Sequence, residues 1–546
     1  MSNLLNKASI ILTPTAYSDG TLHSIKPLQT LGSELVTNGG FDTDSNWVKG
    51  TGWTISGGTA NQDGSNGILR QTNVVSTNTK VKVTFDLTNY GGSGNLQVKF
   101  APSIHTITLT GDGSYTVFTD GTNSVNGDLQ IITQSGFVGS IDNVSVKEVI
   151  DADFDFTRST TGSATGIGTR ENSSGNIESV AADLARIDYL GGTAHILLEP
   201  QSTNVTTNSE QPATWHSNNN VAITTNATTS PEGTTNSSLV VVDGSSGAVH
   251  TRNLCSFSSG SGTQTVTASC FLKYYNHQFV ALRSTFFTGS PAQGERSFFD
   301  IQNGVLGTVS TNHTAKIEDY GNGWYRCSIT FDIDKDTDNV GYMQVEPMND
   351  DNTSTYASIG QGFYAFGSQG EELSFMTSYI PTGSSSVTRS QDAATNSGSS
   401  DLINLTEGVL YCEIAALFSG DGENRCITLS DGTGNLNTVE IFYQENANTI
   451  KYRIKDGSGV NINNTETVAD RTQFNKIALK YKSGDNSMWL NGVKVDTNTS
   501  TFSFTTTLSE LNFAQANNSQ KFFGKVKSVA VFKEALTDTQ LTSLTT

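Results

Sequence analysis

Short stretches in which apolar and polar residues alternate, separated by glycine-rich turns, constrain this chain more than any other feature. Residues 81–87, 96–100, 266–270 and 477–481 each place an apolar side chain at every second position, as a half-buried β-strand does. Only 35% of the 546 residues are hydrophobic and 15% are charged, which suits many short strands joined by polar turns. A chain of this length exceeds a single core. We therefore expect an all-β protein of several sandwich domains.

The formal net charge of −20 excludes some classes of partner. Such a surface repels nucleic acid and anionic membranes, so we predict neither nucleic-acid binding nor membrane insertion. The apolar run at residues 10–12 is too short for a signal peptide or a membrane span, so export would need another route, such as cell lysis. The five widely spaced cysteines indicate neither a disulfide framework nor a zinc site, which fits assembly in a reducing cytoplasm.

Patterning divides the chain into five segments. Residues 1–33 contain too few apolar positions for a core and are expected to form an anchor on a partner protein or a leading strand of the next domain. Residues 34–150, 206–396 and 397–546 each show the strand pattern of a sandwich. Residues 151–205 mix charged and apolar residues without a sustained period and are expected to form irregular strands and turns between domains.

The first two sandwich segments share a resemblance. Residues 34–41 (ELVTNGGF), Trp47 and residues 139–146 (GSIDNVSV) resemble the start and end of carbohydrate-binding modules with the galactose-binding-like jelly-roll fold. Residues 321–326 (GNGWYR), 363–367 (FYAFG) and 378–389 resemble the later strands of the same modules in phage proteins. The resemblance implies two divergent copies of one jelly roll.

Residues 186–192 (RIDYLGG) and 197–204 (LLEPQSTN) resemble a connector that joins such modules in many bacteriophage virion proteins. No catalytic or metal-binding template fits them. We therefore interpret Arg186, Asp188 and Glu199 as structural polar contacts. The prediction is an ordered segment wedged between domains.

The last segment resembles laminin-G/concanavalin-A-like sandwiches. Asn491-Gly492 is the favoured two-residue turn of a β-hairpin. Residues 522–526 (FFGKV) and 535–538 (ALTD) follow it in the order found at the end of that fold.

No motif in the chain favours an enzyme. The seven histidines form no zinc-protease pair, and neither a Gly-x-Ser-x-Gly elbow nor a P-loop occurs. A polysaccharide-degrading glycosidase is the enzyme alternative, because the fold of the last segment also hosts glucanases. Their Glu-x-Asp-x-x-Glu pattern is absent, and the odd separation of Glu440 and Glu445 would place them on opposite faces of a strand.

Sugar binding without catalysis needs an exposed aromatic ring and nearby polar groups. The candidates are Trp53, Asn89 and Tyr90 in the first sandwich, and Trp215, Tyr274, Tyr275 and His277 in the second. The strong alternative for each aromatic residue is a place in a core. By resemblance, a structural Ca²⁺ would be bound by Asp142 with backbone oxygens near Gly39 and Phe41; the alternative is a solvated aspartate.

Together these features predict a bacteriophage virion structural protein on the particle surface, serving as a head fibre, capsid decoration or tail fibre. Its modules would bind host or environmental polysaccharide for host attachment, and residues 1–33 or the connector would dock on other virion proteins. Homo-oligomerisation would suit this role, although no coiled-coil heptads specify a trimer. The competing prediction is a purely structural capsid or tail component without sugar binding.

Overall fold

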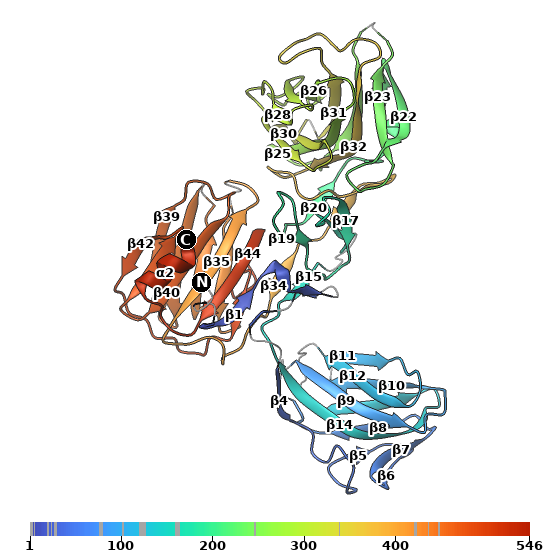
Figure 1. Cartoon of the computed structure of the whole chain (residues 1–546), viewed down its shortest axis with the longest axis vertical. Helices are drawn as coiled ribbons and strands as arrows, with labels where there is room; N and C mark the ends of the chain where they lie inside the picture. Colours follow the sequence, from blue (N-terminus) through green and yellow to red (C-terminus); the bar gives the residue numbers. More distant parts are fainter. Residues whose placement is uncertain are drawn as a thin grey trace. The chain divides into compact units, whose positions relative to one another are not determined.

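A computed structural model describes the chain apart from residues 1–3, 5, 19–20, 23, 27–29, 76–79, 101–102, 120–126, 159–163, 245–246, 338, 420–422, 435 and 446–447. The regular secondary structure of the chain is almost all β-strand, as predicted (Figure 1). Its few helical segments are short: η1 (Pro14–Ala16), η2 (Pro212–Thr214) and α2 (Asp538–Thr545). No helix in these described residues is long and apolar enough to cross a membrane.

The chain forms two compact units. The larger unit combines Met1–Ile25 with Asp153–Thr546, and the inserted unit is Lys26–Ala152. The backbone amide of Ser24 donates a hydrogen bond to the Asp153 carboxylate at 2.5 Å. The chain therefore leaves the larger unit and returns to it at one place.

The inserted unit is a sandwich of two antiparallel sheets. Its apolar alternate positions, such as Val83 and Phe85, point into one core between them. One sheet has the order β11-β10-β13-β8-β5 and the other β12-β9-β14-β7-β6, with β4 beside β14. The strands are β4 (Thr30–Glu34), β5 (Val48–Lys49), β6 (Trp53–Ser56), β7 (Thr59–Asp63), β8 (Ile68–Gln71), β9 (Val81–Thr88), β10 (Asn95–Phe100), β11 (Ser103–Ile107), β12 (Gly113–Thr119), β13 (Leu129–Gln134) and β14 (Val138–Ile150).

The middle sandwich, within residues 206–396, has two six-stranded sheets. Their orders are β21-β24-β31-β26-β27-β28 and β22-β23-β32-β25-β30-β29. Cys255, Cys270 and Cys327 lie in its core as small buried residues. The strands are β21 (Ser217–Asn219), β22 (Val221–Thr228), β23 (Ser237–Val242), β24 (His250–Ser256), β25 (Thr263–Tyr274), β26 (Phe279–Thr285), β27 (Arg296–Asp300), β28 (Val305–Leu306), β29 (Thr314–Asp319), β30 (Trp324–Asp334), β31 (Val340–Pro347) and β32 (Gly362–Glu371).

The C-terminal sandwich, residues 397–546, packs an eight-stranded sheet against the five-stranded sheet β39-β38-β37-β36-β43. Asn491 and Gly492 both have positive φ, 48° and 87°, and form the predicted hairpin turn between β41 and β42. The strands are β35 (Glu407–Ala416), β36 (Arg425–Ser430), β37 (Thr438–Tyr443), β38 (Thr449–Asp456), β39 (Gly459–Thr467), β40 (Asn475–Lys482), β41 (Asn486–Leu490), β42 (Val493–Asn498), β43 (Glu510–Asn512) and β44 (Gly524–Phe532).

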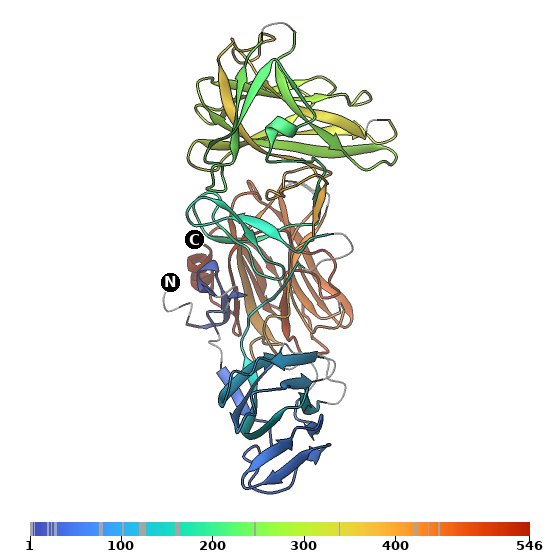
Figure 2. The same cartoon turned by 90° about the vertical axis from the view of Figure 1, so that its right-hand side faces the viewer.

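The N-terminal strand β1 (Ala8–Leu12) belongs to this C-terminal sandwich and not to the sandwich that follows it in sequence. It pairs antiparallel with β44, from Ala8 opposite Phe532 to Leu12 opposite Val529. Figure 2 shows the N-terminal segment beside the C-terminal helix, and the two share one apolar cluster. After η1, the short hairpin β2 (Tyr17–Ser18) and β3 (Thr21–Leu22) leads to the inserted unit.

Short strands of the connector, residues 151–205, pair with both sandwiches of the larger unit. β20 pairs with β33 and β15 with β34, at the end of the middle sandwich, while β19 pairs with β44 of the C-terminal sandwich. The strands are β15 (Asp155–Thr157), β16 (Gly168–Glu171), β17 (Ile177–Val180), β18 (Ile187–Asp188), β19 (His195–Leu198), β20 (Ser202–Asn204), β33 (Val387–Arg389) and β34 (Ala393–Thr395). The described part of the connector, residues 151–158 and 164–205, therefore packs between the two sandwiches, as predicted.

A buried network of charges fixes the connector. Arg186 pairs with Glu199 at 2.8 Å and with Asp392, and Arg158 reaches Asp392 at 2.8 Å. Arg389 adds a third guanidinium, 3.3 Å from Glu199. Asp188 instead pairs with His195 at 3.1 Å. These buried groups are structural contacts, which confirms the interpretation of Arg186, Asp188 and Glu199.

Candidate functional site

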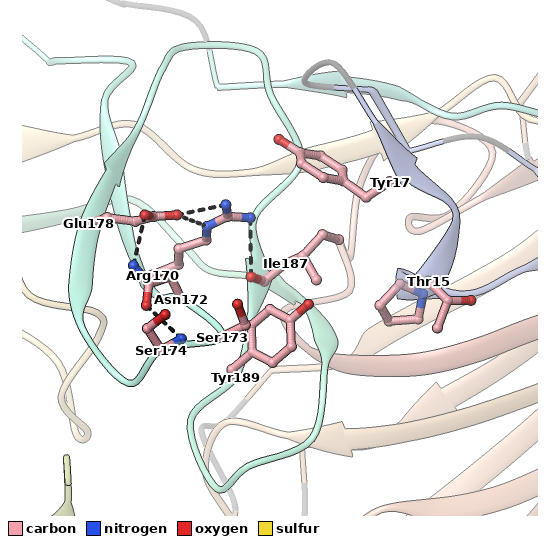
Figure 3. A pocket seen from close by; sticks show the side chains of 10 residues that line it. Thr15, Tyr17, Arg170, Asn172, Ser173, Ser174, Glu178, Ile187 and Tyr189 are labelled. Carbon is pink, nitrogen blue, oxygen red and sulfur yellow. Dashed lines mark hydrogen bonds and ion pairs between the residues drawn. The ribbon is translucent and has the colours of Figure 1, made fainter.

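A cavity of about 330 Å³ lies within the larger unit, where the N-terminal segment meets the connector (Figure 3). Its volume is within the range of small-ligand sites. The N-terminal segment contributes Pro14, Thr15 and Tyr17. The connector contributes the remaining lining residues, which are Arg170, Asn172, Ser173, Ser174, Glu178, Ile187 and Tyr189.

The β16–β17 hairpin positions the charged wall of this cavity. Arg170 and Glu178 are directly opposite in the ladder, and their side chains pair at 2.7 Å. The turn between the strands places Asn172, whose Nδ2 donates to Glu178 Oε2 at 2.9 Å. Burial favours the neutral acid, but the hydrogen bond from Asn172 and the pairing with Arg170 outweigh it and lower the pKa of Glu178. The pair is thus ionised and balanced in charge.

Two tyrosines form the aromatic part of the cavity. Tyr189 follows β18 in a tight turn, where Gly192 N donates to Tyr189 O at 2.7 Å. Tyr17 follows η1, and the Arg170 guanidinium lies 5.5 Å from its ring centre. Both rings are partly exposed, and Figure 3 shows them on either side of Ile187. Partly exposed rings beside hydroxyl and amide groups provide what a sugar ring needs.

The sugar-binding residues predicted in the inserted unit do not all lie at its surface. Trp53 is only 5% exposed and belongs to the core, so it presents no face to a ligand. Tyr90 packs partly against that core with its hydroxyl on Gly94 O at 3.2 Å, while Asn89 next to it is exposed. The structure therefore keeps Asn89 and the edge of Tyr90 at the surface and removes Trp53 from it.

In the middle sandwich, two of the four predicted residues are buried. Trp215 lies in the core and donates through Nε1 to Asn208 O at 3.1 Å, and His277 contacts Met348 O at 2.6 Å through Nε2. Tyr274 and Tyr275 are 37% and 43% exposed. Trp215 and His277 therefore support the fold, because their polar atoms are already bound inside it.

The predicted calcium ligands lie at one turn. Within the inserted unit, Gly39 O accepts a hydrogen bond from Val144 N at 2.9 Å, which closes the turn against β14. Asp142 Oδ1 lies beside Gly40 and accepts from Asn143 N at 2.6 Å. Phe41 has a positive φ of 52° in the same turn. A carboxylate and backbone carbonyl oxygens are the donor types that Ca²⁺ accepts.

Sequence reasoning selected both segments of the cavity but not their meeting. The stretch around Tyr189 stood out as the connector, and Tyr17 lies next to the Thr13-Pro14-Thr15 turn. Their approach depends on β1 pairing with β44, more than 500 residues away. No local pattern reports a contact of that range.

The carboxylates considered for glycoside cleavage do not form an exposed pair. Glu440 is fully buried in β37, beside Arg453 and 3.8 Å from Lys455. Across the described residues, no group of three or more His, Cys, Asp and Glu side chains forms a metal-binding cluster.

Comparisons with known proteins bear on the fold. Residues 416–542 match the family described as the concanavalin A-like lectin/glucanases superfamily. A search of curated proteins gave no match. Among solved structures, the chain is similar to the CBM40 of the Ruminococcus gnavus IT-sialidase bound to α2,3-sialyllactose, with 15% identity, 28% of this chain and 94% of that chain covered, and a TM-score of 0.24.

Two further structures cover more of the chain. The tandem CBM22-1-CBM22-2 domain of Paenibacillus barcinonensis Xyn10C has 13% identity, covers 62% of this chain and 97% of its own, and has a TM-score of 0.21. Domains LG4-5 of the mouse laminin α1 chain have 10% identity, cover 54% and 94%, and have a TM-score of 0.20. The family match confirms the laminin-G/concanavalin-A-like resemblance of the C-terminal sandwich.

Proposed function

We propose that this chain is a non-catalytic glycan-binding adhesin. The observation that carries the proposal is the cavity walled by Tyr17 and Tyr189, with hydroxyl and amide groups between the rings. Because Arg170 and Glu178 neutralise each other, the cavity suits an uncharged sugar, which would stack on tyrosine and hydrogen-bond to Asn172 and the serines.

Two observations support a binding role over a hydrolytic one. Among the described residues, Glu178 is the single carboxylate that lines the cavity, whereas glycoside cleavage ordinarily uses two carboxylates that flank the bond. Glu178 also has a lowered pKa, which is the opposite of what a general acid needs. The fold match of the C-terminal sandwich to a superfamily of lectins and glucanases is compatible with sugar binding.

The proposed setting is the surface of a bacteriophage particle. It rests on the resemblance of residues 186–192 and 197–204 to a phage connector, whose charged residues Arg186 and Glu199 form a buried ion pair. Weak sites would gain strength from several copies per particle, because linked binding raises avidity without new contacts. Antibody labelling of intact virions in electron micrographs tests this setting, and unlabelled particles would contradict it.

A structural Ca²⁺ bound by Asp142 and the carbonyl oxygens near Gly39 and Phe41 accompanies the proposal. It would stabilise the turn and take no part in sugar binding. Removing divalent ions with EDTA should then lower the melting temperature of the wild type and leave that of Asp142→Asn unchanged. Identical shifts in both proteins would rule out this ligand set.

The site is tested by glycan-array screening of the wild type, followed by titration of the best neutral ligand. Tyr189→Ala should weaken binding at least tenfold, about 1.4 kcal/mol, because the stacking ring is lost. Tyr189→Phe keeps the ring and should retain most of the affinity.

Tyr275→Ala is the matched control, since Tyr275 is an exposed tyrosine of the middle sandwich. A loss with Tyr275→Ala and none with Tyr189→Ala would move the site away from the cavity. Failure of every array glycan to bind would favour a purely structural role.

A further inference from the structure

One face of the middle sandwich carries a row of polar residues across five strands. In the sheet β21-β24-β31-β26-β27, the directly opposite partners are Ser217, Arg252, Gln344, Arg283 and Arg296. Core residues such as Met343 and Leu282 occupy the alternate positions and point to the other face. Three arginines therefore share one sheet face in a chain of net charge −20.

Two of these arginines share one carboxylate. Glu346, fully buried on the same face, pairs with Arg296 and lies 3.5 Å from Arg283. Gln344 Nε2 donates to Glu346 Oε1 at 2.6 Å. One buried carboxylate thus holds two guanidinium groups, and the face retains an excess of positive charge.

Arg252 has no such partner. Its guanidinium lies 4.5 Å from the ring centre of Tyr342 and 5.2 Å from that of Phe286. No carboxylate in the described part of the chain pairs with it, and its buried Nε has no hydrogen-bond acceptor. The side chain is half-buried and its two terminal nitrogens are not among the buried atoms, so they remain accessible to a ligand.

Its neighbours also lack partners. Both ring nitrogens of His250, two residues before Arg252 on β24, and the hydroxyl of Thr285, opposite Tyr342, are buried without hydrogen bonds. Buried polar groups are ordinarily paired in more than about 90% of cases. Arg252, His250 and Thr285 thus lie on one sheet face, and the unpaired atoms of His250 and Thr285 are shielded from solvent.

Aromatic side chains border this place. Phe286 is 54% exposed and has a φ of 67°, which strains a bulky residue by roughly 1–3 kcal/mol. Its ring meets Tyr342 edge-on at 5.3 Å, and His216 lies 4.6 Å from Tyr342 on the same cluster. Strain of this kind persists where the surroundings impose it, often at ligand sites.

We propose that this face binds a carboxylate-bearing saccharide, such as a hexuronate oligosaccharide, with Arg252 receiving the carboxylate. The planar guanidinium matches a carboxylate through two parallel hydrogen bonds. Phe286 and Tyr342, which border the Arg252 guanidinium, would contact the apolar face of the sugar. One unpaired arginine balances one carboxylate. This site shares no residue with the cavity at Tyr189 and does not depend on it.

The test compares oligogalacturonate with its neutral methyl ester on the full-length protein by calorimetric titration. The wild type should prefer the acid at least tenfold. Arg252→Gln should abolish this preference, and Arg252→Lys should keep only part of it because the planar fork is lost. Arg425→Gln is the matched control, because Arg425 also stacks on a ring, 4.8 Å from the centre of Phe523, in the C-terminal sandwich.

A second variant guards against misfolding of Arg252→Gln. Glycine accepts the φ of position 286, so Phe286→Gly should fold with an unchanged or raised melting temperature and still bind the acid at least threefold more weakly. Equal binding of acid and ester by the wild type, or full acid binding by Arg252→Gln, would overturn the proposal. Preferential binding of dextran sulfate would overturn the carboxylate assignment. Tyr189→Ala should leave acid binding intact, so this inference and the proposed function fail independently.

Discussion

Glu171 shows how a single side chain can make the stability of the larger unit depend on pH. It lies on β16 beside Asp188, and its buried Oε2 has no hydrogen-bond partner. Burial, followed by repulsion from Asp188, raises its pKa from 4.5 to about 7. Folding therefore favours its protonated form, and the folded state is penalised once the group ionises.

The free energy of unfolding of the larger unit should fall as pH rises from about 4.5, where unfolded Glu171 ionises, to about 7, where the folded group does. Glu171→Gln mimics the protonated acid and removes this contribution. We expect a higher melting temperature for Glu171→Gln than for wild type at pH 8 and little difference at pH 4, measured by thermal unfolding. Glu534→Gln, at an exposed ion pair with Lys7, is the control. A constant difference between Glu171→Gln and wild type at all pH values would contradict the assignment.

The sequence predicted correctly that the connector charges are structural. It failed for side chains whose role depends on whether they are buried. The connector charges Arg186 and Glu199 were predicted as structural because no catalytic spacing surrounds them, and they are. Trp53 and Trp215 were selected because tryptophan can stack on sugar. Both are buried, and the sequence alone does not distinguish an exposed tryptophan from one in a core. No sequence pattern singled out Arg252. Its Nε lacks a hydrogen-bond acceptor because of how the chain folds around it, and a local motif does not show this.

At the scale of elements, β1 closes the sheet edge of a sandwich that begins almost 400 residues later. Ile10 and Leu12 are fully buried, and the strand shares β44 with the connector strand β19. An uncovered β44 would be an unpaired edge and a site for aggregation. The alternation in the sandwiches predicted strands, but the short apolar run at residues 10–12 of β1 carries no information about its partner.

Leu12→Ala should destabilise the C-terminal sandwich by about 3 kcal/mol, because it removes buried methyl groups and leaves a cavity. Denaturant unfolding monitored by the fluorescence of Trp489, which lies in the cluster with β1, would measure this. Lys7→Ala, which breaks an exposed ion pair with Glu534, should cost less than about 1 kcal/mol. If the two variants were equally stable, β1 would not be integral to the sandwich.

At the scale of the molecule, the inserted unit interrupts the larger unit between Ile25 and Asp153. The compact units divide after residues 25 and 152, whereas the predicted boundaries were after residues 33 and 150. From the sequence we expected domains that follow one another along the chain. Instead, residues 1–25 and 153–546 form one unit, which includes β1 and the connector. This discontinuity arises because β1 pairs with β44, and neither strand's sequence indicates the other as its partner.

Replacing residues 26–152 with two glycines should leave the larger unit folded. Ser24 already contacts Asp153, and Ile25 N donates to Ile11 O at 2.7 Å, so the junction needs no long bridge. Circular dichroism should show an unchanged melting temperature for the remaining transition, and the neutral ligand of the cavity should still bind. Loss of cooperative unfolding would mean that the larger unit depends on the insertion.

The paired exit and return at Ser24 and Asp153 also has a mechanical consequence. A pull on the inserted unit is divided between two chain crossings that start from the same point. One crossing leads through β2 and β3 to the β1–β44 ladder, and the other leads through β15 to the buried arginines. The β1–β44 ladder and the buried arginine network therefore share the tension. If one of them ruptures, the inserted unit stays attached through the other.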